Sequence, residues 1–151
     1  TTGVSIQQME FKLDSGPIIA EQEITIGINE NKEELKNSLI KIGGNLLCET
    51  LPKILNKTIT FKKQDEEKAT YCKKINKEDG EINLTDDPIK NWNKYRAFYG
   101  WPGTYFFKEK LNKKIRIKIK KAKYENHSFI IERVIPEGRK EISYSDFLKQ
   151  N

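Results

Sequence analysis

Cysteine and histidine are scarce in this sequence of 151 residues, which contains Cys48, Cys72 and the single histidine His127. The two cysteines stand far apart and form no Cys-x-x-Cys pair, so the sequence predicts no metal site and two buried or idle thiols. No apolar run approaches the roughly 18 residues of a membrane span, and no apolar segment follows a basic start. We therefore expect a soluble protein with no membrane partner.

Positive charge, in contrast, is abundant and concentrated in one segment. The net charge of the chain is +6, and residues 108–123 hold nine Lys or Arg against one acid, Glu109, which gives +8. Because +6 minus +8 is −2, the rest of the chain is mildly acidic. Local charge of this kind favours a polyanionic partner, although a basic strand face can also be merely solvated. The candidate nucleic-acid contacts are Lys113, Lys114, Arg116, Lys118, Lys120, Lys121 and Lys123.

The first 60 residues have the pattern of a strand pair followed by a helix. Strand-like apolar runs cover 4–9 and 17–26, and an amphipathic helical pattern covers 31–51. Asn31 opens this pattern with capping-box spacing, and we expect Pro52 to break or kink the helix. A strand pair and one helix leave this half short of a core, so we expect it to be unstable alone.

Residues 61–78 are rich in Lys, Glu and Gln, which predicts an exposed linker. Asp87 then has the position of an N-cap before Pro88, and the helix that follows should end before Gly100. We expect the aromatic residues around this helix and its corner to belong to the hydrophobic core rather than to stack on bases. They are Trp92, Trp101, Tyr105, Phe106 and Phe107.

The remaining chain has the pattern of short strands over 104–107, 114–124 and 128–135, with a short piece near Ile142. Isoleucines alternate with Lys and Arg along the second strand, so one face should pack inward while the other presents positive charge. Residues 125–127 have the composition of a hairpin turn. Several short strands and a helix suit a small barrel, but they do not distinguish an OB-like fold from a meander.

Six motifs occur in an order that strongly resembles the methionyl-tRNA formyltransferases, of the folate-dependent formyltransferase superfamily, across nearly the whole chain. The first two, 2–9 and the Leu13-Asp14-Ser15-Gly16-Pro17 loop, are shared by several members of that superfamily. The later motifs carry the specificity; they lie at 69–75, 77–83, 96–103 and 134–140.

The resemblance implies an α/β plus β fold. Residues 1–60 would be the C-terminal part of a nucleotide-binding-like α/β catalytic domain, 61–78 a linker, and 79–151 an OB-like, tRNA-binding β-barrel domain. The family's upstream Asn-x-His element and the first half of the catalytic domain are not in this sequence. The chain would then be a C-terminal portion, inactive alone, whose partners are the missing N-terminal half and initiator methionyl-tRNA.

The resemblance also implies a reaction, the transfer of a formyl group from 10-formyltetrahydrofolate to the amino group of methionyl initiator tRNA. Asp14 matches the family's aspartate that orients a catalytic histidine, and Leu13, Asp14 and Ser15 would border the pterin end of the folate. Read from residues alone, Asp14 is more simply an Asx-turn residue. The implied setting is a monomer in the cytoplasm of a bacterium or in an organelle matrix.

Two alternatives remain open from the sequence. One is a formyltransferase of a small substrate, a nucleotide sugar or a purine precursor, which would not need the basic strand. The other is a stand-alone RNA-binding module without catalysis.

Overall fold

The structure is a computed structural model that describes residues 1–110 and 113–149. The chain divides into two compact units, Thr1–Lys73 and Lys74–Asn151. Each unit has its own antiparallel sheet, two-stranded in the first and four-stranded in the second. The bounds 1–60, 61–78 and 79–151 for catalytic part, linker and binding domain stay predictions.

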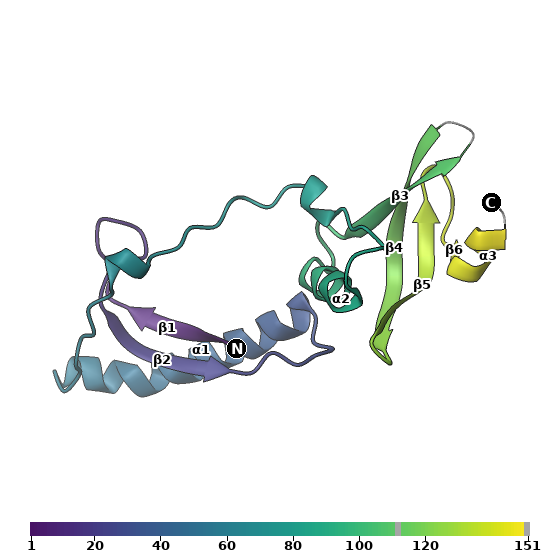
Figure 1. Cartoon of the computed structure of the whole chain (residues 1–151). Helices are drawn as coiled ribbons and strands as arrows, with labels where there is room; N and C mark the ends of the chain where they lie inside the picture. Colours follow the sequence, from purple (N-terminus) through teal and green to yellow (C-terminus); the bar gives the residue numbers. More distant parts are fainter. Residues whose placement is uncertain (111–112, 150–151) are drawn as a thin grey trace. The chain divides into compact units, whose positions relative to one another are not determined.

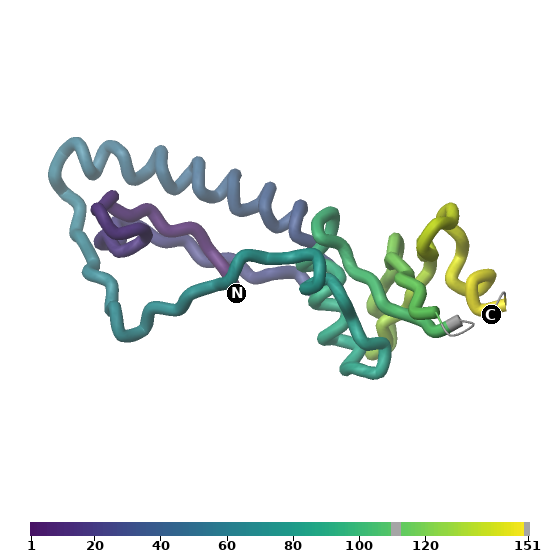
Figure 2. Tube along the Cα trace, turned by 90° about the horizontal axis from the view of Figure 1, so that it is seen from above, coloured from purple at the N-terminus to yellow at the C-terminus, as the bar shows by residue number. Residues whose placement is uncertain are grey.

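In the first unit a β-hairpin packs on one long helix (Figure 1). Strand β1 (Thr2–Gln7) pairs antiparallel with β2 (Ile18–Ile24), and α1 (Lys32–Leu55) follows. Figure 2 shows α1 running along the length of this hairpin. Gly43 permits the close approach, because a Cβ there would lie 3.2 Å from Val4 Cγ1.

Helix α1 begins as its sequence predicts and ends later than predicted. Asn31 Oδ1 accepts hydrogen bonds from the N–H groups of Glu33 and Glu34, and the Glu34 carboxylate accepts from the Asn31 N–H, which completes a capping box. Of the predicted break or kink at Pro52, the break was wrong, because α1 continues to Leu55. Pro52 lies in the last turn, so the backbone hydrogen bond that it removes comes close to a helix end that would fray in any case.

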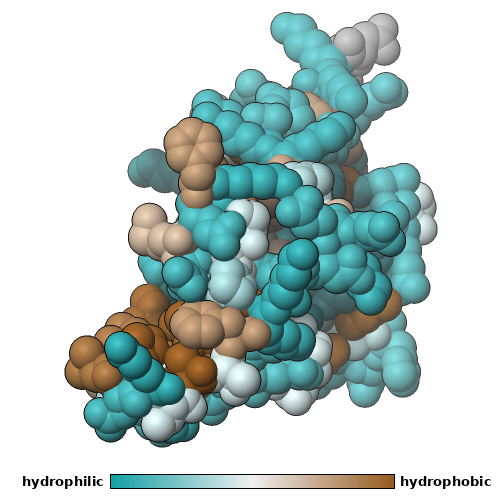
Figure 3. Space-filling model, turned by 90° about the vertical axis from the view of Figure 1, so that its left-hand side faces the viewer, coloured by the Kyte–Doolittle hydropathy of each residue, from teal (hydrophilic) through white to brown (hydrophobic). Residues whose placement is uncertain are grey.

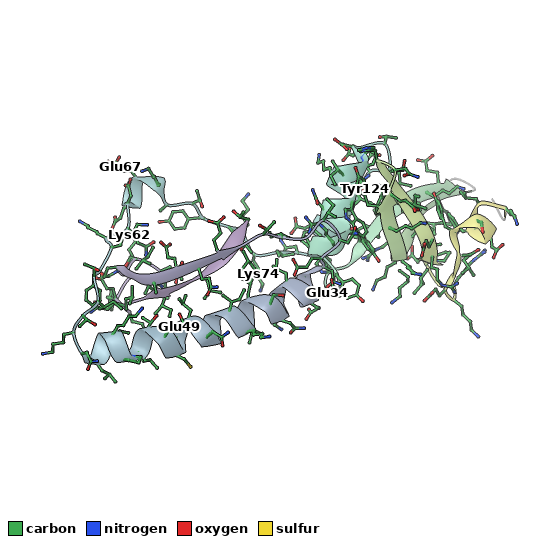
Figure 4. The ribbon with its side chains drawn as sticks, turned by 90° about the horizontal axis from the view of Figure 1, so that it is seen from below. Glu34, Glu49, Lys62, Glu67, Lys74 and Tyr124 are labelled. Atoms are coloured by element: carbon green, nitrogen blue, oxygen red, sulfur yellow. The ribbon has the colours of Figure 1, made fainter. Side chains whose placement is uncertain are left out.

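The first unit buries little apolar surface, as the sequence predicts. Leu46 is the one buried hydrophobic side chain among its described residues, while Phe11, Leu13 and Leu55 are exposed. Figure 3 shows hydrophobic side chains, in brown, gathered toward the lower left of that view. In Figure 4, Glu34 lies at one end of the unit and Lys62 at the other.

The second unit is built on a sheet of order β3-β4-β5-β6. All neighbouring strands in it are antiparallel. No pairing between β3 and β6 occurs in the part of the chain that the structure describes, so the OB-like barrel stays a prediction. The strands are β3 (Thr104–Lys110), β4 (Lys113–Glu125), β5 (Ser128–Pro136) and β6 (Ile142–Ser143).

Helix α2 (Pro88–Ala97) and the short α3 (Tyr144–Lys149) both contact β5 (Figure 1). Asp87 caps α2, since its carboxylate accepts from the Ile89 N–H at 3.0 Å, as predicted. The hydrophobic core lies in this unit and joins the sheet to both helices. Its buried members are Ile82, Phe106, Ile117, Ile119, Ile131, Val134 and Phe147.

We expect Ile117→Ala to lower the free energy of unfolding of the second unit by about 2–5 kcal/mol, because Ile117 is only 1% exposed and the truncation leaves a cavity. Chemical denaturation followed by tryptophan fluorescence measures this. Ile130→Ala on β5 is the matched control, since Ile130 is exposed. Equal losses in the two variants would contradict the assignment of the core.

Candidate nucleic-acid interface and loop site

Strand β4 separates an apolar face from a cationic face. Ile117 and Ile119 are buried in the core, whereas Lys118 and Lys120 are exposed, so the predicted alternation is confirmed. Because successive side chains on a strand point to opposite sides, a regular strand would carry this alternation to its end. It would then turn Lys121 and Lys123 toward the core.

Two compensating bulges prevent this. Ile119 pairs with Val134, Lys121 with Arg133, and Ala122 with Ile131. Lys120 is therefore an extra residue on β4, and Glu132 is an extra residue on β5. Because each strand has one extra residue, the pairing of the two strands beyond the bulges returns to the original register. Within each strand, however, the side chains beyond the bulge point to the face opposite to the one that strict alternation predicts.

The phase change keeps the cations beyond the bulge off the core side. Beyond the bulge Ala122 packs against the core cluster, and Tyr124 stacks on Trp92 of α2 at 6.4 Å between ring centroids. Lys121 and Lys123 are exposed. The structure therefore brings six of the seven predicted cations onto one outer face of the strand, whereas Lys113, the first residue of β4, alternates to the side of Ile115 and Ile117. This basic face consists of Lys114, Arg116, Lys118, Lys120, Lys121 and Lys123.

The hydroxyl of Tyr95 on α2 bridges the bulge in β4. It donates to the Lys120 carbonyl oxygen at 3.3 Å and accepts from the Ala122 N–H at 3.3 Å. A bulge interrupts the ladder and frees backbone groups, and a phenol can satisfy both because it is a donor and an acceptor. Burial raises the pKa of Tyr95, so the phenol stays protonated around neutral pH and can keep both bonds. No local pattern in the sequence indicates this role of Tyr95, which depends on the packing of α2 against β4.

The seven predicted cations of β4 have three kinds of surroundings. Arg116 lies over the Tyr105 ring, 3.8 Å from its centroid, and Lys114 lies over Phe107 at 4.2 Å. Lys121 pairs with Glu132 at 2.9 Å and Lys123 with Glu125 at 2.5 Å. The remaining three, Lys113, Lys118 and Lys120, form no ion pair within residues 1–110 and 113–149.

Each of these two ion pairs shifts the pKa of one of its members. The hydrogen bond from Lys121 lowers the pKa of Glu132, and the hydrogen bond to Glu125 raises the pKa of Lys123. Lys121, Lys123 and Glu125 are exposed and Glu132 is half-exposed, so water and salt screen both pairs and neither holds its lysine firmly. The pairs can therefore open to release both lysines to an anionic partner.

The predicted folate residues lie together in the loop between β1 and β2. Asp14 is exposed and has a positive φ of 55°, and its carboxylate accepts from Gln7 Nε2 at 3.2 Å. The Ser15 hydroxyl donates to the Lys12 carbonyl at 2.9 Å. Leu13 is 90% exposed, so its side chain is available to a ligand or to another part of a protein.

Gln64 holds this loop, and sequence reasoning missed it. Its Nε2 lies within 2.8 Å of the Asp14 carbonyl oxygen, 2.7 Å of the Gly16 carbonyl oxygen and 3.2 Å of Gln7 Oε1. Two backbone hydrogen bonds between Ile18 and Lys62, at 2.8 and 2.9 Å, bring Gln64 into place. A glutamine in a polar segment gives no local signal for such a contact, which depends on the pairing of residues 44 positions apart.

The structure does not gather a catalytic group around Asp14. His127 has a positive φ of 59° in the tight turn between β4 and β5, as predicted, and belongs to the other unit. Cys48 and Cys72 are both exposed. Within the described residues no cluster of three His, Cys, Asp or Glu could hold a metal ion, and no helix is long and apolar enough to cross a membrane.

The aromatic predictions are confirmed in part. Trp92, Tyr105 and Phe106 are buried, and Phe107 is half-buried beneath Lys114. The assignment of Trp101 to the core was wrong, because its side chain is 53% exposed. Trp101 lies at the corner between α2 and β3, where the chain turns outward before it enters the sheet.

Residues 74–130 match a family model described as formyl transferase, C-terminal domain. The methionyl-tRNA formyltransferase of Geotalea daltonii is 32% identical over 165 residues, an alignment that covers 97% of this chain and 53% of the relative. Another such enzyme, from Geobacter sulfurreducens, is 33% identical over 106 residues and is covered to 33% of its length. The chain thus spans about a third to a half of the curated relatives that it matches.

Solved structures share the fold. The methionyl-tRNA formyltransferase from Clostridium thermocellum superposes with a TM-score of 0.60 at 20% identity, and the match covers 94% of this chain and 56% of that one. An N-formyltransferase from Helicobacter canadensis, in complex with folinic acid and dTDP-3-aminofucose, gives 0.61 at 20% identity and covers 93% and 54%. The fold is therefore common to formyltransferases of different substrates.

Removal of the bridging hydroxyl should destabilise the second unit. We expect Tyr95→Phe to lower its free energy of unfolding by about 1–3 kcal/mol, because the Lys120 carbonyl and the Ala122 N–H lose their partner. Thermal and urea unfolding measure the loss. Tyr99→Phe, on the same segment but exposed, is the control and should change stability by less than about 0.5 kcal/mol. A Tyr95→Phe protein as stable as the parent would show that the bridge is unimportant.

Loss of the Gln64 amide should loosen the loop. We expect Gln64→Ala to speed hydrogen exchange of the Gln8 N–H, which donates to the Pro17 carbonyl, by about tenfold, since net hydrogen bonds contribute about 0.5–1.5 kcal/mol each. Exchange measured by NMR or mass spectrometry reports this change. Gln22→Ala on β2 serves as the control, and similar exchange in both variants would contradict the role of Gln64.

Proposed function

Because this chain is related to the C-terminal portion of the methionyl-tRNA formyltransferases, we propose that it is part of an enzyme that formylates methionyl initiator tRNA in translation initiation. The formyl donor is 10-formyltetrahydrofolate, and the enzyme acts as a monomer in the cytoplasm of a bacterium or in an organelle matrix. The observation that supports this proposal most directly is the basic face of β4. A transferase of small substrates has no need of six cations on one strand face.

In this proposal the two units have separate tasks. Residues 1–60 complete the folate-binding catalytic domain, residues 61–78 form the linker, and residues 79–151 form an OB-like domain that binds tRNA. Contacts from Lys and Arg on the basic face go to phosphates, so they position the acceptor stem without reading its sequence. The domain therefore supplies affinity and register, and specificity for the initiator comes from elsewhere in the enzyme.

The loop of Leu13, Asp14 and Ser15 borders the pterin end of the folate. An ionised Asp14 is an acceptor only, so it can orient and support a histidine N–H but cannot donate to the oxyanion of a tetrahedral intermediate. Gln7 and Gln64 fix the loop that presents it. No Asn-x-His element occurs in these 151 residues, so residues 1–151 alone do not transfer a formyl group.

The function is tested by the salt dependence of tRNA binding. We expect the triple replacement Lys114→Gln, Lys118→Gln, Lys120→Gln to weaken binding of initiator tRNA and to reduce the slope of log K against log salt by about 0.7–0.9 per lost phosphate contact. The measurement is a fluorescence titration at several salt concentrations. These lysines form no ion pair among the described residues, so the change leaves no carboxylate unpaired.

The matched control replaces Lys41, Lys53 and Lys57 of the first unit by Gln, which lowers the net charge from +6 to +3 as the test variant does. If both variants lose slope equally, the effect is one of total charge and the basic face is not an interface. If the parent chain binds dTDP-sugars but not tRNA, the enzyme belongs with the formyltransferases of small substrates.

A further inference from the structure

The hairpin of β3 and β4 extends past the rest of its sheet. Pairing between β4 and β5 starts at Ile117, whereas β3 and β4 stay paired outward to Lys110 and Lys113. Figure 1 shows this end of the hairpin beyond the end of β5. Residues 107–110 and 113–116 therefore form a two-stranded ribbon, and no third strand pairs with it in the described part of the chain.

One side of this ribbon belongs to the basic face. Lys114 and Arg116 lie there, above the rings of Phe107 and Tyr105. The register pairs Arg116 with Phe107 and Lys114 with Glu109, and directly paired residues share a side of a sheet. Glu109 therefore lies on this side too, where the two cations outnumber it.

The opposite side of the ribbon, its back face, carries cations as well. Lys108 pairs with Ile115, and Lys113 lies two positions before Ile115, so both lysines lie on the side that continues into the core. The Lys108 ammonium lies 5.1 Å from the centroid of the Phe147 ring of α3. Lys108 also lines a hollow together with Arg139, which follows β5. Lys113 is exposed.

One carboxylate opposes an anion on the back face, because Glu137 lines the same hollow as Lys108. Its Oε2 accepts a hydrogen bond from the Arg116 N–H at 3.3 Å, so a backbone donor already satisfies part of its negative charge. The cations Lys108, Lys113 and Arg139 outnumber this acid. The back face of the ribbon is therefore positively charged, like the front.

Aromatic rings hold cations on both sides of the ribbon. Arg116 and Lys114 lie over rings on the front, and Lys108 lies over a ring on the back. A lysine that serves only solubility needs no such support. A side chain that is already held loses less conformational entropy when it binds an anion. Both sides of the ribbon are thus prepared for anions.

We propose that the ribbon enters between two backbone segments of one folded RNA, so that Lys114 and Arg116 bind phosphates of one segment while Lys108 and Lys113 bind phosphates of the other. The assignment to RNA rests on the proposed function. A two-stranded ribbon is small enough to enter a nucleic-acid groove, but the major groove of a regular A-form helix is narrow. The two segments therefore belong to different parts of the RNA fold and not to one helix.

The double replacement Lys108→Gln, Lys113→Gln tests the back face in the full chain. We expect weaker binding of initiator tRNA and a salt slope that is smaller by about 0.7–0.9 per lost phosphate contact. Lys41→Gln, Lys53→Gln in the first unit removes the same charge and is the matched control. Lys113→Gln alone, at an exposed position, gives the same test without disturbing Phe147. Slopes equal to that of the control would overturn the proposal.

An RNA hairpin that contains only the acceptor stem separates this inference from the proposed function. It offers one helix, so we expect the back-face variant to bind it as the parent does, whereas Lys114→Gln, Lys118→Gln, Lys120→Gln weakens binding to both RNAs. An equal loss of slope on both RNAs in the back-face variant would contradict the two segments. If only the front variant loses slope, the two-sided ribbon is wrong and the proposed function stands. If the parent binds neither RNA, both are wrong.

Discussion

The Tyr95 hydroxyl, and the bulge in β4 that it satisfies, decide how the charge of the second unit is displayed. Without the bulge at Lys120, strict alternation would place Lys121 and Lys123 on the core side of the sheet and Ala122 outside. The second bulge at Glu132 restores the register of β5, so Ile131 and Val134 both stay in the core. One phenol contributed by a helix thus allows a strand of 13 residues to be apolar on one side and cationic on the other.

The two units differ in how large a hydrophobic core they bury. The second unit has a connected core that includes Val134, which is fully buried, and both of its helices are anchored to the sheet. The first unit is a hairpin on a helix, and a two-stranded hairpin is marginal in water unless other elements cover it. Its apolar residues Phe11, Leu13 and Leu55 remain at the surface. This contrast is consistent with relatives that are two to three times as long as the matched region.

Local signals in the sequence were sufficient for most elements. Asn31 and Asp87 cap the helices that they were predicted to cap, and the hairpin turn of Asn126 and His127 adopts positive φ values. Alternation predicted which isoleucines face the core up to Ile119. These features depend on neighbours a few residues apart, for which periodicity and turn chemistry are reliable guides.

Non-local contacts were not predictable in the same way. Gln64 reaches the Asp14 loop only because residue 62 pairs with residue 18, and Tyr95 meets the bulge only because α2 lies against β4. Trp101, expected in the core, is exposed at the corner between α2 and β3.

The central claim is that the outer face of β4 is the surface that meets RNA, and an NMR footprint tests it most directly. In a titration of the isotope-labelled chain with initiator tRNA, we expect the largest backbone and side-chain shifts along β4 between Lys114 and Lys123, with the buried residue Val134 and the hairpin of the first unit little changed. Shifts confined to the loop around Asp14, or spread evenly over the lysines of both units, would contradict the account.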